Sequence, residues 1–156
     1  MTQFADMIAS GFATGAVHYR DFYPHEDRIA RLVLAVTVAE HTTVQAIVDT
    51  GAPWCIFAPN IVQDYVQADH TFSVTLLIRG ISYAGKLVRM KIGSSADRGG
   101  DDLDVDATVF VPTLPPGVEW PHPNFIGLDG FLNRIRFAVD PSDNIFYFGP
   151  VDGDPL

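Results

Sequence analysis

Residues 44–52, VQAIVDTGA, place an acid directly after an apolar run. The β-branched and apolar residues before Asp49 are typical of a buried strand. An ionised carboxylate left unpaired in an apolar interior costs on the order of several kcal/mol. The strand is therefore expected to end at Asp49, where Thr50 and Gly51 supply a turn. An aspartate at such a turn either caps its own backbone or offers its carboxylate for chemistry.

Short extended runs closed by turns continue along the rest of the chain. Neighbouring runs predict hairpins at residues 28–50 and 71–93. Residues 58–67 have a proline near their start and apolar residues at helical spacing, so they predict a short helix. Further strands are expected at residues 53–57, 105–112 and 145–149, and residues 125–140 are expected to run from an apolar strand end through a turn into another strand. The pattern predicts an all-β fold with one or two short helices.

The length of 156 residues is sufficient for one domain with a hydrophobic core. Residues 1–27 have no clear period, so they are expected to form an irregular N-terminal arm with one strand. The domain proper is expected over residues 28–149, followed by a loose tail at residues 150–156. AIVDTGA and NFIGLDG each run from an apolar strand into a turn with glycine, which suggests two similar half-units.

The net charge of the chain limits the kinds of partner that it is expected to bind. Lys and Arg number 10 against 19 Asp and Glu, and this net charge of −9 argues against nucleic acid or an anionic membrane as a partner. The first residues lack the basic and apolar regions of a signal peptide, and no apolar run reaches the roughly 20 residues needed to cross a bilayer. Cys55 is the single cysteine, so a cytoplasmic, reducing setting is expected.

No cofactor and no metal site are predicted. The five histidines do not have the spacing of a metal motif, and no glycine-rich phosphate loop is present. The acidic run at residues 101–106 suggests calcium, but Ala107 stands at the required glycine of such a loop and Thr113 at its closing glutamate. We expect a solvated loop there. Cys55 has no flanking histidine and is expected to be a small core hydrophobe.

An acid followed by a hydroxyl residue and a glycine has a specific chemical use. Two such carboxylates brought together cannot both ionise, so they share one proton. The pair then acts as a base toward water and as an acid toward a leaving amine. Gly51 permits close approach of other backbone, and the Thr50 hydroxyl can hold the turn rigid through hydrogen bonds.

These residues resemble the retropepsin-like family, the short retroviral-type branch of the aspartic proteases. IVDTGA, residues 47–52, is similar to the active-site signature of that family, and FIGLDGFL, residues 125–132, is similar to its second motif. The resemblance covers residues 28–149 in order. It implies an acid-protease β-barrel with one lobe in each chain, which hydrolyses peptide bonds of a peptide or protein substrate without a cofactor.

The resemblance also implies roles for single residues. Asp49 would be the catalytic acid, Thr50 would form the hydrogen bonds of the active-site floor across a dimer, and Gly51 would let substrate backbone lie close. The chain has no second Asp-Thr-Gly or Asp-Ser-Gly, and Asp129 falls at a scaffold position. One chain thus supplies half a site, and activity would need a symmetric homodimer.

Two positions depart from the family pattern. Retroviral members often carry an acid after the signature alanine and an arginine after the first glycine of the second motif. This chain has Pro53 and Leu128 at those positions. No charge is left without its partner, but the pair that stabilises the family's dimer is absent. The dimer is therefore expected to be weaker or differently built.

The family closes its cleft with a β-hairpin flap, and residues 78–86, IRGISYAGK, are the best match. Glycines in this hairpin give the flexibility that a lid needs. Substrate contacts are expected from residues of the signature and of this hairpin: Ala52, Trp54, Gly80, Ile81 and Tyr83. An ordinary hairpin with an exposed tyrosine fits residues 78–86 equally well. Trp54 and Trp120 are more readily packing residues than subsite walls.

Three functions stay open on the sequence. The first is a homodimeric aspartic endopeptidase, which the two motifs favour. The second is a monomeric or catalytically silent module that binds peptides in the same groove. The absent charge pair at Pro53 and Leu128 favours this module, because a monomer has no pair of Asp49 carboxylates. The third is a half-site that a different chain completes.

Overall fold

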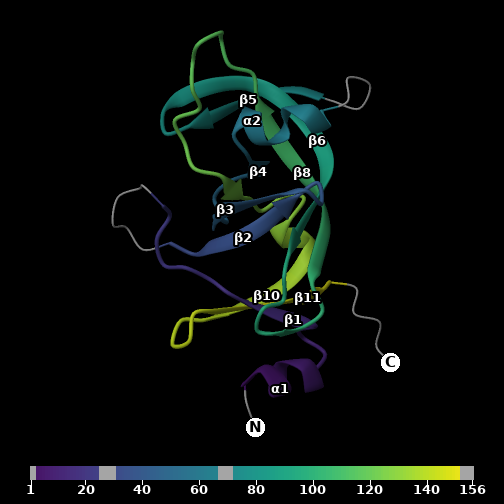
Figure 1. Ribbon diagram of the computed structural model, residues 1–156. Coiled ribbons are helices and arrows are strands. Elements are labelled where there is room, and N and C mark those ends of the chain that lie inside the picture. Colours follow the sequence, from purple (N-terminus) through teal and green to yellow (C-terminus); the bar gives the residue numbers. More distant parts are fainter. Residues whose placement is uncertain (1–2, 25–30, 67–71, 152–156) are drawn as a thin grey trace.

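A closed ring of strands forms the main body of the structure. The computed structural model describes residues 3–24, 31–66 and 72–151. The strands of the larger sheet are β2 (Val33–Val38), β3 (Thr42–Val48), β4 (Cys55–Ile56), β5 (Phe72–Ile78), β6 (Ile81–Ser94), β8 (Leu103–Pro112) and β9 (Phe125–Ile126). They lie in the order β2-β3-β9-β4-β8-β6-β5, and an additional pairing of β2 with β6 closes the ring and leaves β5 outside it (Figure 1). The predicted all-β fold is confirmed.

A smaller sheet packs at one end of this barrel. Its strands are β1 (Gly15–His18), β7 (Gly99–Gly100), β10 (Ile135–Asp140) and β11 (Ile145–Pro150), in the order β10-β11-β1-β7. Figure 1 shows helix α1 (Gln3–Ala9) beyond this sheet, near the N-terminus. The single strand expected in residues 1–27 is β1, which pairs along its whole length with β11.

Helix α1 was not expected in the N-terminal arm, and its contacts explain why. Phe4 and Met7 pack on a small cluster that contains Ala16 and Tyr147, and the rings of Phe4 and Tyr147 stack with their centroids 6.4 Å apart. A seven-residue helix is too short to be stable alone. Its stability therefore comes from a distant strand, and local periodicity does not reveal it.

The predicted helix at residues 58–67 is confirmed in a shorter form. It consists of α2 (Pro59–Val62) and a 3₁₀ turn, η1 (Gln63–Tyr65). Another 3₁₀ turn, η3 (Leu132–Arg134), follows the turn of the second motif. None of the helices in the described part of the chain is long and apolar enough to span a bilayer.

Strands β6 and β8 are the longest and form the back of the barrel. Val88, Met90 and Ile92 are buried while Arg89 and Lys91 between them are exposed, as the alternation of a half-buried strand requires. The largest fully buried side chains of the molecule include Phe57, Phe110, Phe131, Phe146 and Phe148. Aromatic residues therefore fill the interior of both sheets.

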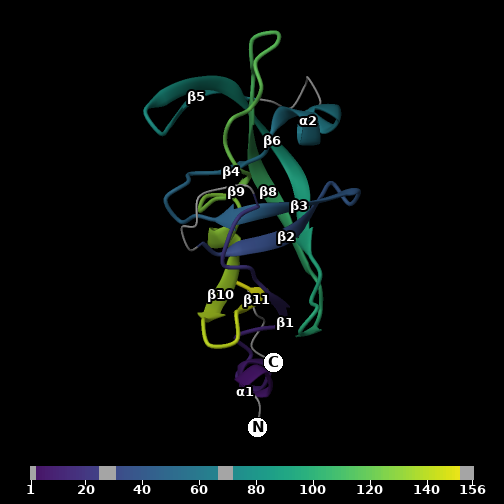
Figure 2. The same ribbon diagram turned by 60° about the vertical axis from the view of Figure 1, so that its left-hand side comes forward.

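The β5–β6 hairpin, which the sequence predicts, extends beyond the ring. Ile78 pairs with Ile81, so Arg79 and Gly80 form a two-residue turn. Both turn residues have positive φ, +49° and +83°, which is the geometry preferred in tight hairpins. In Figure 2 the tip of this hairpin and the turn between β3 and β4 project on the same side of the barrel.

Asn124 is a buried polar residue that ties several segments together. Its Oδ1 accepts a hydrogen bond from the Ala58 N–H (3.1 Å), and its Nδ2 donates to the Gln45 carbonyl (3.1 Å). Its carbonyl accepts from the Ile47 N–H (2.8 Å), and its own N–H donates to the Tyr23 hydroxyl (3.2 Å). Asn124 thereby fixes β9 beside β3, the strand that leads to Asp49.

Replacing Asn124 is expected to destabilise the fold. Asn124→Ala removes the partners of the Ala58 N–H and the Gln45 carbonyl, so we expect the free energy of unfolding to fall by about 2–4 kcal/mol. Urea denaturation followed by circular dichroism measures the loss. The matched control is Asn60→Ala on the exposed face of α2, which should change stability by no more than about 0.5 kcal/mol. Equal effects of both substitutions would contradict this role.

Candidate active site

Asp49 stands at the end of β3, as predicted, and its carboxylate is oriented by the turn that follows. Its backbone N–H donates to the Ile126 carbonyl (2.9 Å), and its Oδ1 accepts a hydrogen bond from the Gly51 N–H (2.8 Å). A Cβ atom at residue 51 would lie 3.1 Å from Oδ1. Glycine at 51 therefore leaves room for the carboxylate to keep this orientation.

The second motif lies directly beside the Asp49 turn. Strands β3 and β9 are parallel, with Ile47 opposite Phe125 and Val48 opposite Ile126. These are the strand ends of the two half-units that the sequence suggests. In each half-unit a turn follows directly after the strand. Because the two strands run parallel and side by side, the two turns lie next to each other.

Two backbone hydrogen bonds join these turns. The Leu128 N–H donates to the Ala52 carbonyl (2.8 Å) and the Asp129 N–H donates to the Pro53 carbonyl (2.7 Å). Gly127 lies so close to the backbone of Trp54 that no Cβ fits there. The glycine of the second motif therefore permits the contact that holds the Asp49 turn in place.

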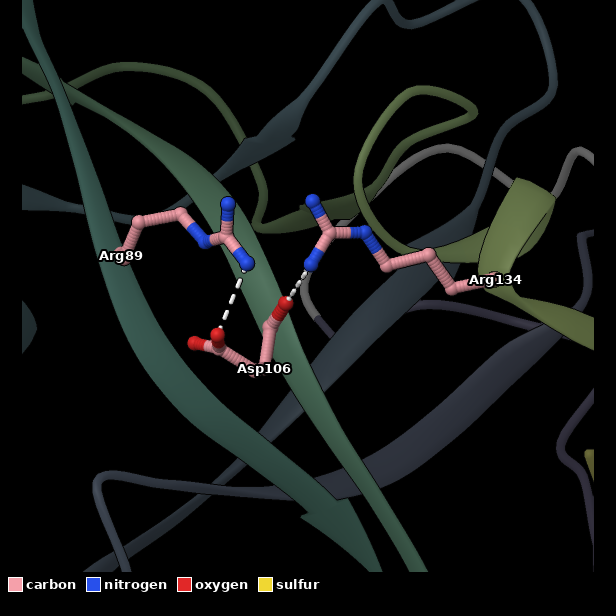
Figure 3. Close-up of polar contacts among 3 residues, drawn as sticks. All are labelled: Arg89, Asp106 and Arg134. Atoms are coloured by element: carbon pink, nitrogen blue, oxygen red, sulfur yellow. Dashed lines mark hydrogen bonds and ion pairs between the residues drawn. The ribbon is translucent and has the colours of Figure 1, made fainter.

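The segment after the second motif is anchored to β8. Arg134, in η3, donates a hydrogen bond to the Asp106 carbonyl, and the Asp106 carboxylate pairs with Arg89 at 2.7 Å (Figure 3). The Asp129 side chain accepts from Asn133 Nδ2 (3.2 Å) and is exposed. Asp129 thus makes a contact within its own turn.

A cavity of about 660 Å³ opens in front of Asp49. Its walls come from β3, β4, β9 and the Asp49 turn on one side and from the β5 end of the hairpin on the other. The apolar lining residues are Leu32, Ile47, Val48, Ala52, Pro53, Ile56, Leu76, Leu77, Ile78 and Phe125, and the remaining ones are Tyr19, Asp21, Arg31, Asp49, Gly51 and Arg79. A hydrophobic peptide side chain fits such walls.

Three of the signature residues predicted for the site, Asp49, Gly51 and Ala52, line this cavity. Thr50 lies between them with its side chain exposed, and its hydroxyl makes no hydrogen bond to the described residues. Trp54 packs in the hydrophobic cluster of Ile56 and Phe125 and is not in the cavity lining.

Within the predicted flap, Ile78 and Arg79 line the cavity, whereas Gly80, Ile81 and Tyr83, the residues expected to contact substrate, do not. Gly80 and Ile81 are exposed at the hairpin tip, next to the cavity residue Arg79. Tyr83 points elsewhere: its hydroxyl is 2.9 Å from His122 Nε2, and its ring meets the Trp120 ring edge-on at 4.9 Å. Tyr83 therefore connects the hairpin to the segment before β9.

The other strand of the hairpin supplies the cavity wall instead. Leu76, Leu77 and Ile78 of β5 line the cavity. Leu76 and Leu77 lie before the predicted flap, and the sequence does not reveal them because a hairpin pattern does not show which strand faces a neighbour. Asp21 and Arg31 were also missed. Asp21 lies in the arm without a period and Arg31 lies at the start of the predicted hairpin over residues 28–50. Neither pattern indicates a neighbour of Asp49, and only the folded chain brings the two residues to its cavity.

Pro53 and Leu128, the positions of the absent charge pair, lie on the two joined turns. Leu128 is 45% exposed, an unusual degree for leucine beside a candidate active site, and Pro53 is exposed as well. An apolar surface therefore stands where the family resemblance implies an ion pair.

Cys55 is buried in β4 and is not a candidate nucleophile. Burial raises the pKa of its thiol to about 12, so the reactive thiolate is nearly absent at neutral pH. This agrees with the predicted role of a small core hydrophobe.

The burial of Cys55 has a measurable consequence. At pH 8 the native protein should react with Ellman's reagent about a thousandfold more slowly than the protein unfolded in guanidinium chloride, since a thiol of ordinary pKa is substantially ionised at that pH. Absorbance at 412 nm follows both reactions. Fast native labelling would show that the thiol is accessible.

Comparison with known proteins identifies the fold. No protein-family model and no curated protein matches the sequence. Among solved structures, the crystal structure of a retropepsin-like aspartic protease from Rickettsia conorii matches with a TM-score of 0.52 at 12% sequence identity, over 85% of this chain and 97% of that one. At this identity the match shows the fold: the chain is a retropepsin-like β-barrel.

Proposed function

We propose that the protein is an aspartic endopeptidase in which two Asp49 carboxylates, one from each subunit of a homodimer, activate a water molecule. The observation that carries this proposal is the placement of Asp49. Its carboxylate lies at the wall of a largely apolar cavity, is oriented by the Gly51 N–H, and makes no ion pair with any residue that the structure describes.

In the proposed reaction the two carboxylates share one proton. The ionised carboxylate takes a proton from water as the water oxygen bonds to the peptide carbonyl carbon, and the protonated one gives its proton to the carbonyl oxygen. The resulting diol collapses when the C–N bond breaks and the amine nitrogen takes up a proton. The enzyme forms no covalent bond to the substrate.

Surface features of the Asp49 turn support a second copy of the chain as the partner. The sequence offers one Asp-Thr-Gly, and two carboxylates must meet for a proton to be shared. Thr50 and Leu128 are exposed on this turn and its neighbour. A twofold axis through this face would cover both side chains and bring the Asp49 carboxylates together.

The substrate would bind as an extended peptide between the Asp49 turn and the β5–β6 hairpin. Within the described residues β5 pairs with β6 alone, so its other edge is open to a peptide strand. Leu76, Leu77 and Ile78 of β5 line the cavity opposite Ile47 and Phe125. We therefore expect hydrophobic side chains next to the bond that is cleaved.

Asp49→Asn is expected to lower kcat/KM by at least about a thousandfold, because an amide cannot share or accept the proton. A library of diverse peptides incubated between pH 4 and pH 8 and analysed by mass spectrometry provides the substrates. The matched control is Asp129→Asn on the neighbouring turn, which should keep its activity. Unchanged activity in Asp49→Asn would refute the assignment.

The homodimer is tested by mixing subunits. At concentrations where the protein is dimeric, a threefold excess of Asp49→Asn over wild type should reduce activity to about a quarter, since most wild-type subunits then pair with an inactive one. The same excess of Asp129→Asn should raise total activity. Sedimentation velocity at micromolar concentration measures the dimer directly.

A peptide-binding module is the second candidate function, and the exposed Leu128 with Pro53 in place of an ion pair favours it. A strict monomer in sedimentation that binds hydrophobic peptides without cleaving them would support the module. Activity that appears only on addition of a different chain would support a heteromeric site.

A further inference from the structure

The ratio of acidic to basic residues in the cavity lining differs from that of the whole chain. The protein has 19 acidic and 10 basic side chains, yet the cavity contains two arginines, Arg31 and Arg79, and two aspartates, Asp21 and Asp49. In the proposed dimer the Asp49 pair shares a proton and carries a single negative charge. The cavity lining is therefore less acidic than the chain as a whole.

Arg31 lines the cavity from the segment that leads into β2. It is half-buried, directly before Leu32 and Val33, and its backbone N–H donates to the Asp21 carbonyl (2.5 Å). Among the described residues its guanidinium makes no ion pair. Removing a charge from water is costly unless it is paired, so a bound carboxylate would stabilise this half-buried guanidinium.

The acid nearest to Arg31 along the cavity wall is engaged elsewhere. Asp21 Oδ2 accepts a hydrogen bond from Asn144 Nδ2 (3.1 Å) in the turn between β10 and β11. This contact holds the Asp21 carboxylate toward that turn. Arg79 faces the same cavity from the tip of the β5–β6 hairpin. A peptide lying between floor and hairpin would pass an arginine on each side.

From this arrangement we infer that Arg31 forms a subsite for an acidic side chain, so that the preferred substrates carry Asp or Glu close to the hydrophobic residues at the cleaved bond. The inference rests on the proposed function and adds a substrate class to it. A guanidinium suits this task because it binds a carboxylate through two parallel hydrogen bonds. The apolar walls around Arg31 strengthen the attraction by lowering the local dielectric constant.

The test compares peptides that differ by one charge. Peptides identical except for Glu, Gln or Lys at each position flanking the scissile bond are cleaved by wild type, Arg31→Gln and Arg31→Glu. In wild type, Glu at one position should raise kcat/KM by about tenfold or more over Gln. The preference should fall below about twofold in Arg31→Gln, and Lys should become the preferred residue at that position in Arg31→Glu.

A matched control and a binding measurement complete the experiment. Arg98→Gln, an exposed arginine outside the cavity, should keep the wild-type preference. Fluorescence anisotropy of the same peptides with Asp49→Asn and with Asp49→Asn/Arg31→Gln measures the preference without cleavage.

The outcomes separate this inference from the proposed function. Cleavage by wild type with no preference for Glu at any position, or a preference that survives Arg31→Gln, would overturn the acidic subsite and leave the protease intact. Binding that favours Glu and depends on Arg31, without any cleavage, would support the acidic subsite and refute the proposed protease activity. Absence of both cleavage and binding would refute the two together.

Discussion

The structure depends on the contact between two turns at the centre of the barrel. The turn after β3 carries Asp49, and the turn after β9 donates two backbone hydrogen bonds to it, from Leu128 and Asp129. Backbone hydrogen bonds set the position of a turn independently of side-chain rotamers. Gly127 is essential to this contact, because a side chain at that position would overlap the backbone of Trp54.

Several long-range hydrogen bonds reinforce the same arrangement from behind. Asn124 joins β9 to β3 and to the segment after β4, and Arg134 joins the end of the second motif to β8. A catalytic carboxylate needs such support, because a displacement of about 1 Å costs a large part of the rate. The Asp49 turn contrasts with β5, which lies outside the closed ring and, among the described residues, pairs only with β6.

The sequence predicted the features that local chemistry determines. Patterns of a few residues are sufficient to predict the β-branched strands, the two hairpins and the turn at Asp49. The glycines of FIGLDGFL indicate the second turn, because glycine permits the close approach of two backbone segments. The features it did not predict depend on distant contacts. Helix α1 is held by Tyr147, and Arg31 reaches the cavity because residues far apart in the chain fold around it. Tyr83 turns toward His122 rather than the cavity, since a partner 39 residues away fixes its hydroxyl.

The exposed Leu128 has consequences for how the proposed dimer would behave. Ion pairs at an interface weaken with salt and with changes of pH, whereas apolar contacts strengthen with salts such as sulfate. With Pro53 and Leu128 on the face that carries Asp49, association would be driven mainly by burial of apolar surface. Acidic conditions that protonate surface carboxylates would then leave this contact in place and also reduce the repulsion between two chains of net charge −9. An apolar contact face on an acidic protein therefore favours pairing more strongly as the net negative charge of the chain declines.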